Sequence, residues 1–123
     1  MYTYSFEKLE VWVKSKEFAK TIYKLTSLFP DTEKFNLTSQ LKRSSISISS
    51  NIAEGSARNS YKDKAHFTTI AFSSAVEALN QIIICFEIGL ISQQDYNDSR
   101  NLLESITNKL NALRNYQIQQ LTK

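Results

Sequence analysis

The sequence predicts an all-α protein, an antiparallel up-down-up-down four-helix bundle that forms a single domain over residues 1–123. Two glycines and one proline are too few for the many turns of an all-β chain. A hydrophobic fraction of 41% with 22% charged residues is too apolar for a disordered chain. Apolar residues recur at helical spacing in four segments, and the short connections between these segments make sequential helices antiparallel neighbours.

The first two helices are expected over residues 5–29 and 37–58. Ser5 is the candidate N-cap of the first helix, and Pro30 ends it because proline cannot continue the backbone hydrogen bonds. Gly55 and the polar residues that follow are expected to close the second helix. The apolar positions expected to face inward are Leu9, Trp12, Ala19, Ile22, Tyr23 and Phe29 in the first helix and Leu37, Leu41, Ile48 and Ile52 in the second.

The third and fourth helices are expected over residues 61–89 and 93–121. Each begins with the Ser-x-x-Asp spacing of a capping box, Ser60 with Asp63 and Ser92 with Asp95. Gly89 is expected to stop the third helix. The expected inward positions are Phe67, Ile70, Ala71, Ser74, Ala78, Gln81, Cys85 and Ile88 in the third helix and Leu103, Ile106, Leu110, Leu113 and Leu121 in the fourth.

Polar residues of the second and third helices are expected to lie level with one another. If the chain reverses near Ser60, residues whose numbers sum to about 120 share a height, because both helices rise by about 1.5 Å per residue. Arg43 would then face Glu77 as an ion pair, and serines would allow close helix approach. This predicted polar seam comprises Arg43, Ser47, Asn51, Glu54, His66, Ser74 and Glu77.

Enzymatic chemistry finds little support in the sequence. A bundle di-metal centre needs carboxylates from several helices and two Glu-x-x-His pairs, whereas this chain offers only Asp63 with His66. Arg58 and His66 straddle the expected turn between two helices, which argues against a ribonuclease with a closely spaced arginine and histidine. Cys85 lies in an apolar run without a nearby base and is expected to be an inert core thiol. We expect no catalytic residues, no metal and no cofactor.

The expected location is the cytoplasm, without membrane contact. The longest apolar run, residues 82–86, is far shorter than the roughly 20 residues of a spanning helix. The first residues lack the basic start and apolar core of a secretory signal. A single cysteine excludes an internal disulfide and fits a reducing compartment.

The basic excess lies in the first half of the chain. Residues 1–64 hold eleven basic and seven acidic groups, whereas residues 65–123 hold four and five. Lys16, Lys20 and Lys24 recur every four residues and share one helix face. Such cations are candidates for phosphate contact, although lysine rows also serve as solvated faces and complement the C-terminal dipole of a helix. The candidates are Lys16, Lys20, Lys24, Lys42, Arg58, Lys62, Lys64, Lys109 and Arg114, and Lys123 also belongs to the basic end of the last helix.

The block Asn51–Gly55 (NIAEG) at its distance from Gln40-Leu41 and Arg43 is specific, and Phe6–Trp12 (FEKLEVW) is a further matching block. Further matching positions are Phe29, Pro30, Leu37, Ser47, Arg58, Phe67, Ala71, Ser74, Glu77 and Gln81. In these residues the chain resembles the four-helix-bundle proteins encoded in intervening sequences of bacterial large-subunit ribosomal RNA genes. Those proteins are relatives of the accessory variability protein of diversity-generating retroelements. The chain departs from the family pattern at Ser44, Ser45 and Ser73, where smaller residues are usual.

The resemblance implies a ring-like homo-oligomer, with a pentamer as the expected ring. It also implies a basic surface that binds RNA or DNA and an accessory role beside a nucleic-acid enzyme such as a reverse transcriptase. The alternative is a structural or protein-binding scaffold without nucleic-acid activity, in which the lysines only maintain solubility.

Overall fold

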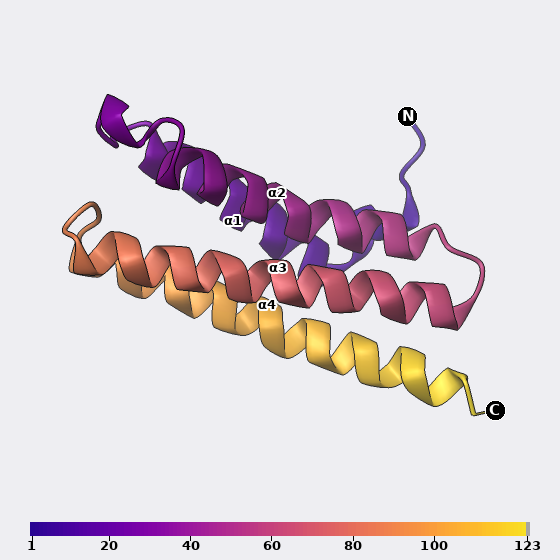
Figure 1. Cartoon of the computed structure of the whole chain (residues 1–123). Helices are drawn as coiled ribbons and strands as arrows, with labels where there is room; N and C mark the ends of the chain where they lie inside the picture. The colour runs from indigo at the N-terminus through magenta and orange to yellow at the C-terminus, as the bar shows by residue number, and fades with distance from the viewer. Residues whose placement is uncertain (123) are drawn as a thin grey trace.

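The computed structural model describes residues 1–122 and confirms the four-helix bundle (Figure 1). Sequential helices are antiparallel, and the first helix also packs against the last, which closes the bundle. Residues 1–122 contain no β-strand. The helices are α1 (Glu10–Thr26), α2 (Leu37–Ser56), α3 (Tyr61–Glu87) and α4 (Gln93–Gln120), with short 3-10 helices η1 (Ser5–Lys8) and η2 (Asp31–Glu33).

The first helix is shorter than the predicted span of residues 5–29, and Ser5 does not cap it. Tyr4 precedes a separate turn, in which its backbone N–H donates to Glu7 Oε2 at 2.8 Å. Leu9 is extended, so α1 begins only at Glu10. At the other end the hydroxyl of Thr26 donates to the Ile22 carbonyl oxygen at 2.7 Å, and the chain tightens into 3-10 turns before Pro30.

Gly55 does not terminate α2 as predicted. It lies inside the helix and is buried, and the helix continues to Ser56. A Cβ atom at Gly55 would lie 2.9 Å from the Cβ of Phe67, so the glycine allows α2 to approach α3 closely. Gly89 does fulfil its predicted role, because it follows the end of α3 with a φ of +82°.

The serine half of each predicted capping box is confirmed. The hydroxyl oxygen of Ser60 accepts a hydrogen bond from the Asp63 N–H at 3.1 Å, and Ser92 accepts from Asp95 at the same distance. Each cap satisfies one of the free N–H groups in the first turn of its helix. The connections before α3 and α4 are therefore specified by local sequence.

The core draws large side chains from all four helices, and α3 also contributes small ones. The alanines at positions 71, 75 and 78 are fully buried, which lets the other helices pack closely against α3. Phe18 of α1 is fully buried although the helical spacing chosen from the sequence omitted it. Ile88 and Leu121, both expected to face inward, are exposed because each lies just beyond its last helical turn. The largest fully buried apolar side chains are Phe18, Ile22, Leu41, Ile48, Ile82, Leu103, Ile106 and Leu110.

Among residues 1–122, α3 is the one helix long and apolar enough to cross a membrane by length and composition. The core helix of a bundle meets the same criterion, and α3 packs against both α2 and α4. Part of its apolar surface nevertheless faces outward. Val76, Ile84 and Ile88 are 47%, 39% and 58% exposed, and with Asn80 they follow one four-residue spacing. We call these four residues the α3 outer row.

Replacement of Gly55 by alanine tests the close approach of α2 and α3. In an unobstructed helix interior this change would stabilise the protein by about 1 kcal/mol. Here the new Cβ would meet Phe67, so we expect a loss of about 1–3 kcal/mol in the free energy of unfolding, measured by urea denaturation. Ser50→Ala, at an exposed position of α2, is the matched control. A stabilised Gly55→Ala variant would show that the helices can separate freely.

Candidate nucleic-acid interface

Three residues of the predicted polar seam meet between α2 and α3. The hydroxyl oxygens of Ser47 and Ser74 lie 2.8 Å apart. Asn51 Nδ2 donates to the Ser47 carbonyl oxygen at 2.8 Å and contacts its hydroxyl at 3.1 Å. Further along, the Ser44 hydroxyl donates to Gln81 Oε1 at 2.7 Å, and both side chains are buried. The Ser44–Gln81 bond was not predicted, because these two residue numbers add up to more than the sum of about 120 that was assumed for residues at the same height.

The predicted ion pair between Arg43 and Glu77 is wrong. Both side chains are exposed, neither forms a salt bridge within residues 1–122, and Arg43 Nη2 lies 3.4 Å from Ser39 Oγ. Glu54 and His66 are also exposed and do not pair with each other. Equal height along two helices does not make side chains face each other, and an exposed ion pair gains little over hydration.

A groove between α1 and α2 combines cations with aromatic rings. Its volume is about 370 Å³. Lys16 Nζ lies 5.1 Å from the centroid of the Trp12 ring, and Lys42 Nζ lies 4.9 Å from that of Tyr23. These distances are within the range of cation–π attraction. We call it the α1–α2 groove, and the residues that line it are Trp12, Lys16, Ala19, Lys20, Tyr23, Ile46 and Ser49.

Two more predicted cations lie on α1. Lys20 Nζ is 3.7 Å from Glu17 Oε1, and both side chains are well exposed, so the pair is weak and leaves the ammonium open to other anions. Lys24 is exposed one helical turn further along. Together with Lys16 and Lys42 these side chains make the α1–α2 face predominantly basic.

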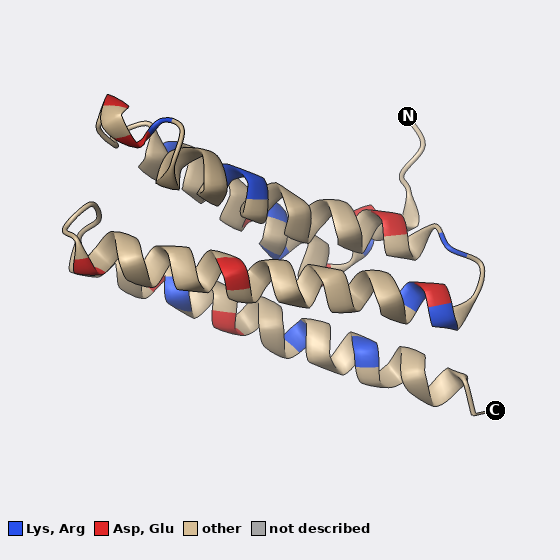
Figure 2. Cartoon of the chain, viewed as in Figure 1, with Lys and Arg blue, Asp and Glu red and all other residues tan. Residues whose placement is uncertain are grey.

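A second basic region surrounds the turn between α2 and α3, which we call the hairpin end. The Arg58 guanidinium lies 4.5 Å from the centroid of the Phe67 ring. Lys62 is exposed at the start of α3. Arg114 of α4 reaches the same end, where its Nε donates to Thr69 Oγ1 at 2.8 Å. Figure 2 shows basic residues on the α2–α3 connection, on the first turn of α3 and on the last third of α4.

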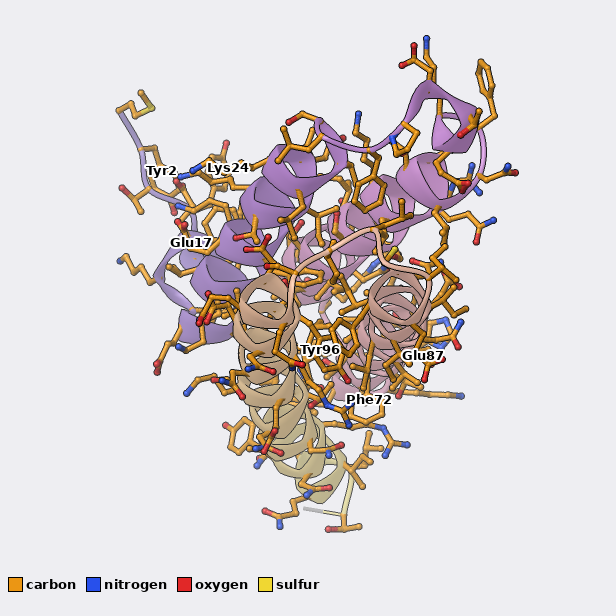
Figure 3. The ribbon with its side chains drawn as sticks, turned by 90° about the vertical axis from the view of Figure 1, so that its left-hand side faces the viewer. Tyr2, Glu17, Lys24, Phe72, Glu87 and Tyr96 are labelled. Atoms are coloured by element: carbon orange, nitrogen blue, oxygen red, sulfur yellow. The ribbon has the colours of Figure 1, made fainter. Side chains whose placement is uncertain are left out.

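The opposite end of the bundle is acidic. Residues 24–36 and 84–98 together hold five acidic and two basic groups. Figure 3 views the molecule from this end, with Glu87 on α3 and Tyr96 on α4. A polyanion would therefore be attracted to the hairpin end and repelled from the other.

The remaining predicted cations differ in environment. Lys109 Nζ lies 3.2 Å from Glu10 Oε2, so it joins α4 to α1 and belongs to neither basic region. Lys64 is half-buried at the hairpin end, and its ammonium donates to the Ser56 carbonyl oxygen at 3.2 Å. Lys123 lies outside the described residues.

Residues that could support catalysis do not converge. Burial, and secondarily the charge of Glu33, raises the pKa of the Cys85 thiol to about 11, which keeps it protonated at neutral pH. Residues 1–122 contain no group of three or more His, Cys, Asp or Glu side chains that could hold a metal ion. His66, the single histidine, lies at the surface.

The fold places the chain in the class of small four-helix-bundle proteins. The model of the family described as 23S rRNA-intervening sequence protein matches residues 7–112, so the chain belongs to that family. The resemblance inferred from the sequence is therefore confirmed.

One solved structure shows the same fold. It is a crystal structure of a protein of unknown function from the S23 ribosomal protein family of Bacteroides thetaiotaomicron. It is 28% identical, with a TM-score of 0.79, and the match covers 85% of this chain and 97% of that one. No match was found among curated proteins.

Neighbouring substitutions on α2 distinguish a surface cation from a buried polar contact. Arg43→Ala should change the free energy of unfolding by less than about 0.5 kcal/mol, because the side chain is exposed and forms no salt bridge within the described residues. Ser44→Ala should cost about 1–3 kcal/mol, because Gln81 Oε1 loses its buried partner. Thermal unfolding of the two variants and the unmodified protein measures both changes. A large loss in the free energy of unfolding of Arg43→Ala would instead indicate that the predicted ion pair with Glu77 forms.

Proposed function

We propose that the protein is a non-enzymatic, homo-oligomeric bundle that binds RNA or DNA through the α1–α2 groove and the hairpin end. The observation that carries this proposal is the placement of Lys16 and Lys42 against the rings of Trp12 and Tyr23. Proteins that bind single strands combine cations for the phosphates with aromatic faces for the bases. A groove with both features can hold a nucleic-acid single strand specifically. The lysine row of α1 alone would attract any polyanion.

The α3 outer row supports self-association. Val76, Ile84 and Ile88 expose apolar surface that a solvated helix face does not need. The proposed occupant is a second copy of the chain, and repetition of this contact would build a ring, with a pentamer as the expected form. A ring would repeat each basic face and so multiply both the electrostatic field and the number of simultaneous contacts.

The proposed setting is the cytoplasm, where the protein would act beside a nucleic-acid enzyme such as a reverse transcriptase. The support for this setting is the family resemblance, and the single buried cysteine agrees with a reducing compartment. The competing candidate is a protein-binding scaffold. The α3 outer row favours it, since the same apolar surface could hold a different protein.

Charge reversal in the α1–α2 groove tests nucleic-acid binding. Lys16→Glu with Lys20→Glu should weaken binding of a single-stranded RNA by about tenfold or more, because two phosphate contacts are lost. The slope of the logarithm of the binding constant against the logarithm of the salt concentration should become shallower by about two. Lys34→Glu with Arg100→Glu changes the net charge equally at exposed positions outside the groove and the hairpin end. Fluorescence anisotropy over a salt titration measures both.

The control decides the interpretation of that experiment. Equal losses in the two double variants would show that only net charge matters and that the groove is not the site. Failure of the unmodified protein to bind RNA or DNA even at low salt would favour the scaffold.

A charge in the α3 outer row tests self-association. Ile84→Lys should reduce the solution mass toward the 14.1 kDa of a single chain, because each interface would bury an unpaired ammonium group. Ile118→Lys introduces the same charge at a similarly exposed isoleucine of α4 and should leave the assembly intact. Analytical ultracentrifugation measures the mass. An unmodified protein already at 14.1 kDa would contradict the proposed ring.

A further inference from the structure

A cavity of about 240 Å³ opens at the hairpin end of the bundle. Its apolar walls include Leu9, Ile52 and Leu113, which come from before α1, from α2 and from α4. Typical pockets for drug-sized ligands measure about 300–1,000 Å³, so this cavity suits a single ring system. We call it the end cavity.

The floor of the end cavity holds a buried polar pair. Thr68 and Gln117 are only 4% and 6% exposed, and the Thr68 hydroxyl lies 2.7 Å from Gln117 Oε1. The same hydroxyl lies 3.0 Å from the Lys64 carbonyl oxygen. The Nε2 end of the Gln117 amide donates no hydrogen bond within residues 1–122, although the side chain lines the cavity. Among the described residues the one buried side-chain polar atom without a hydrogen bond is Ser99 Oγ, so the Gln117 amide nitrogen reaches the cavity surface, where water or the edge of a ligand can accept its N–H groups.

The mouth of the cavity carries two tyrosines and an ammonium group. The rings of Tyr61 and Tyr116 meet edge to face, with centroids 6.2 Å apart, and both side chains are exposed. Lys64 Nζ donates to one carbonyl oxygen, that of Ser56, and forms no salt bridge within the described residues. Its remaining N–H groups can therefore meet an anion.

Further cations lie at the same end of the bundle. Lys62 precedes Lys64 by two residues, and Arg58 and Arg114 belong to the same end of the bundle. The acidic residues closest in sequence to the cavity-lining residues are Glu7, Glu10, Glu54 and Asp63. An occupant with a flat ring, polar atoms on the edge of that ring and an attached anion matches the whole arrangement. A nucleotide has these three features.

We infer that the end cavity takes one unstacked nucleotide of a bound strand, with the base inside and its phosphate at Lys64. The Gln117 amide contacts the base edge, and the tyrosine rings and Leu113 contact its faces. This inference rests on the proposed nucleic-acid binding and adds a preference for single strands over duplexes. Bases of a duplex are stacked and paired, and extruding one costs energy, so single strands should bind better than duplexes.

The test compares a fluorescein-labelled single-stranded uridine 12-mer RNA with a blunt 12-base-pair RNA duplex at one salt concentration, by fluorescence anisotropy. The unmodified protein should bind the single strand more tightly. Tyr116→Ala and Gln117→Leu should each weaken single-strand binding by about tenfold, because a base contact is lost, and leave duplex binding unchanged. Tyr2→Ala, which removes an exposed tyrosine that does not line the cavity, should change neither affinity.

The outcomes separate this inference from the proposed function. If Tyr116→Ala and Gln117→Leu leave the ratio of the two affinities unchanged while Lys16→Glu with Lys20→Glu weakens both, the cavity is not a nucleotide site and the basic groove stands. If the unmodified protein binds neither RNA, both proposals fall. Tyr116 is exposed, so its substitution reports on the cavity even if Gln117→Leu does not fold.

Discussion

The close contact between α2 and α3 is the constraint on which the other features depend. It requires a residue without a side chain at Gly55, where a Cβ atom would lie 2.9 Å from that of Phe67. It also requires short polar side chains, because Ser44 bonds to Gln81 and Ser47 meets Ser74 across the same contact. This pairing holds the hairpin end together, where Arg58, Lys62 and Lys64 lie on or beside the α2–α3 turn. The contact between α2 and α3 also leaves the α3 outer row on the outside of the bundle, where neither α2 nor α4 covers it.

Local sequence signals predicted most of the fold. The four-helix bundle followed from apolar spacing, and the starts of α3 and α4 followed from the serine caps. The errors lie where local contacts compete with the helical pattern. At Tyr4 and Glu7 a side-chain bond closes a separate turn, and the pattern of apolar residues carries no trace of that bond. At Gly55 a terminator and a packing residue look alike in sequence, and only the position of Phe67 distinguishes them.

The candidate site was only partly predictable for a related reason. Charge and spacing identify cations, but their neighbours come from other helices. Lys109 was expected to be free for phosphate and instead contacts Glu10 of α1. Lys42 lies over the Tyr23 ring, which becomes apparent only once the two helices are packed. The end cavity lies between segments far apart in the chain, as the contact between Thr68 and Gln117 shows, so no motif could reveal it.

The separation of charge along the bundle has a consequence for encounters in solution. With cations at the α2–α3 turn and carboxylates at the opposite tip, the molecule is an electric dipole directed roughly along its long axis (Figure 2). A long polyanion would exert a torque on it before any contact forms, and the molecule would rotate to present its α2–α3 turn. Dissolved ions shorten the reach of that torque to about 10 Å at 0.1 M ionic strength. Orientation during approach would therefore be strongest in dilute electrolyte and would decline as electrolyte is added.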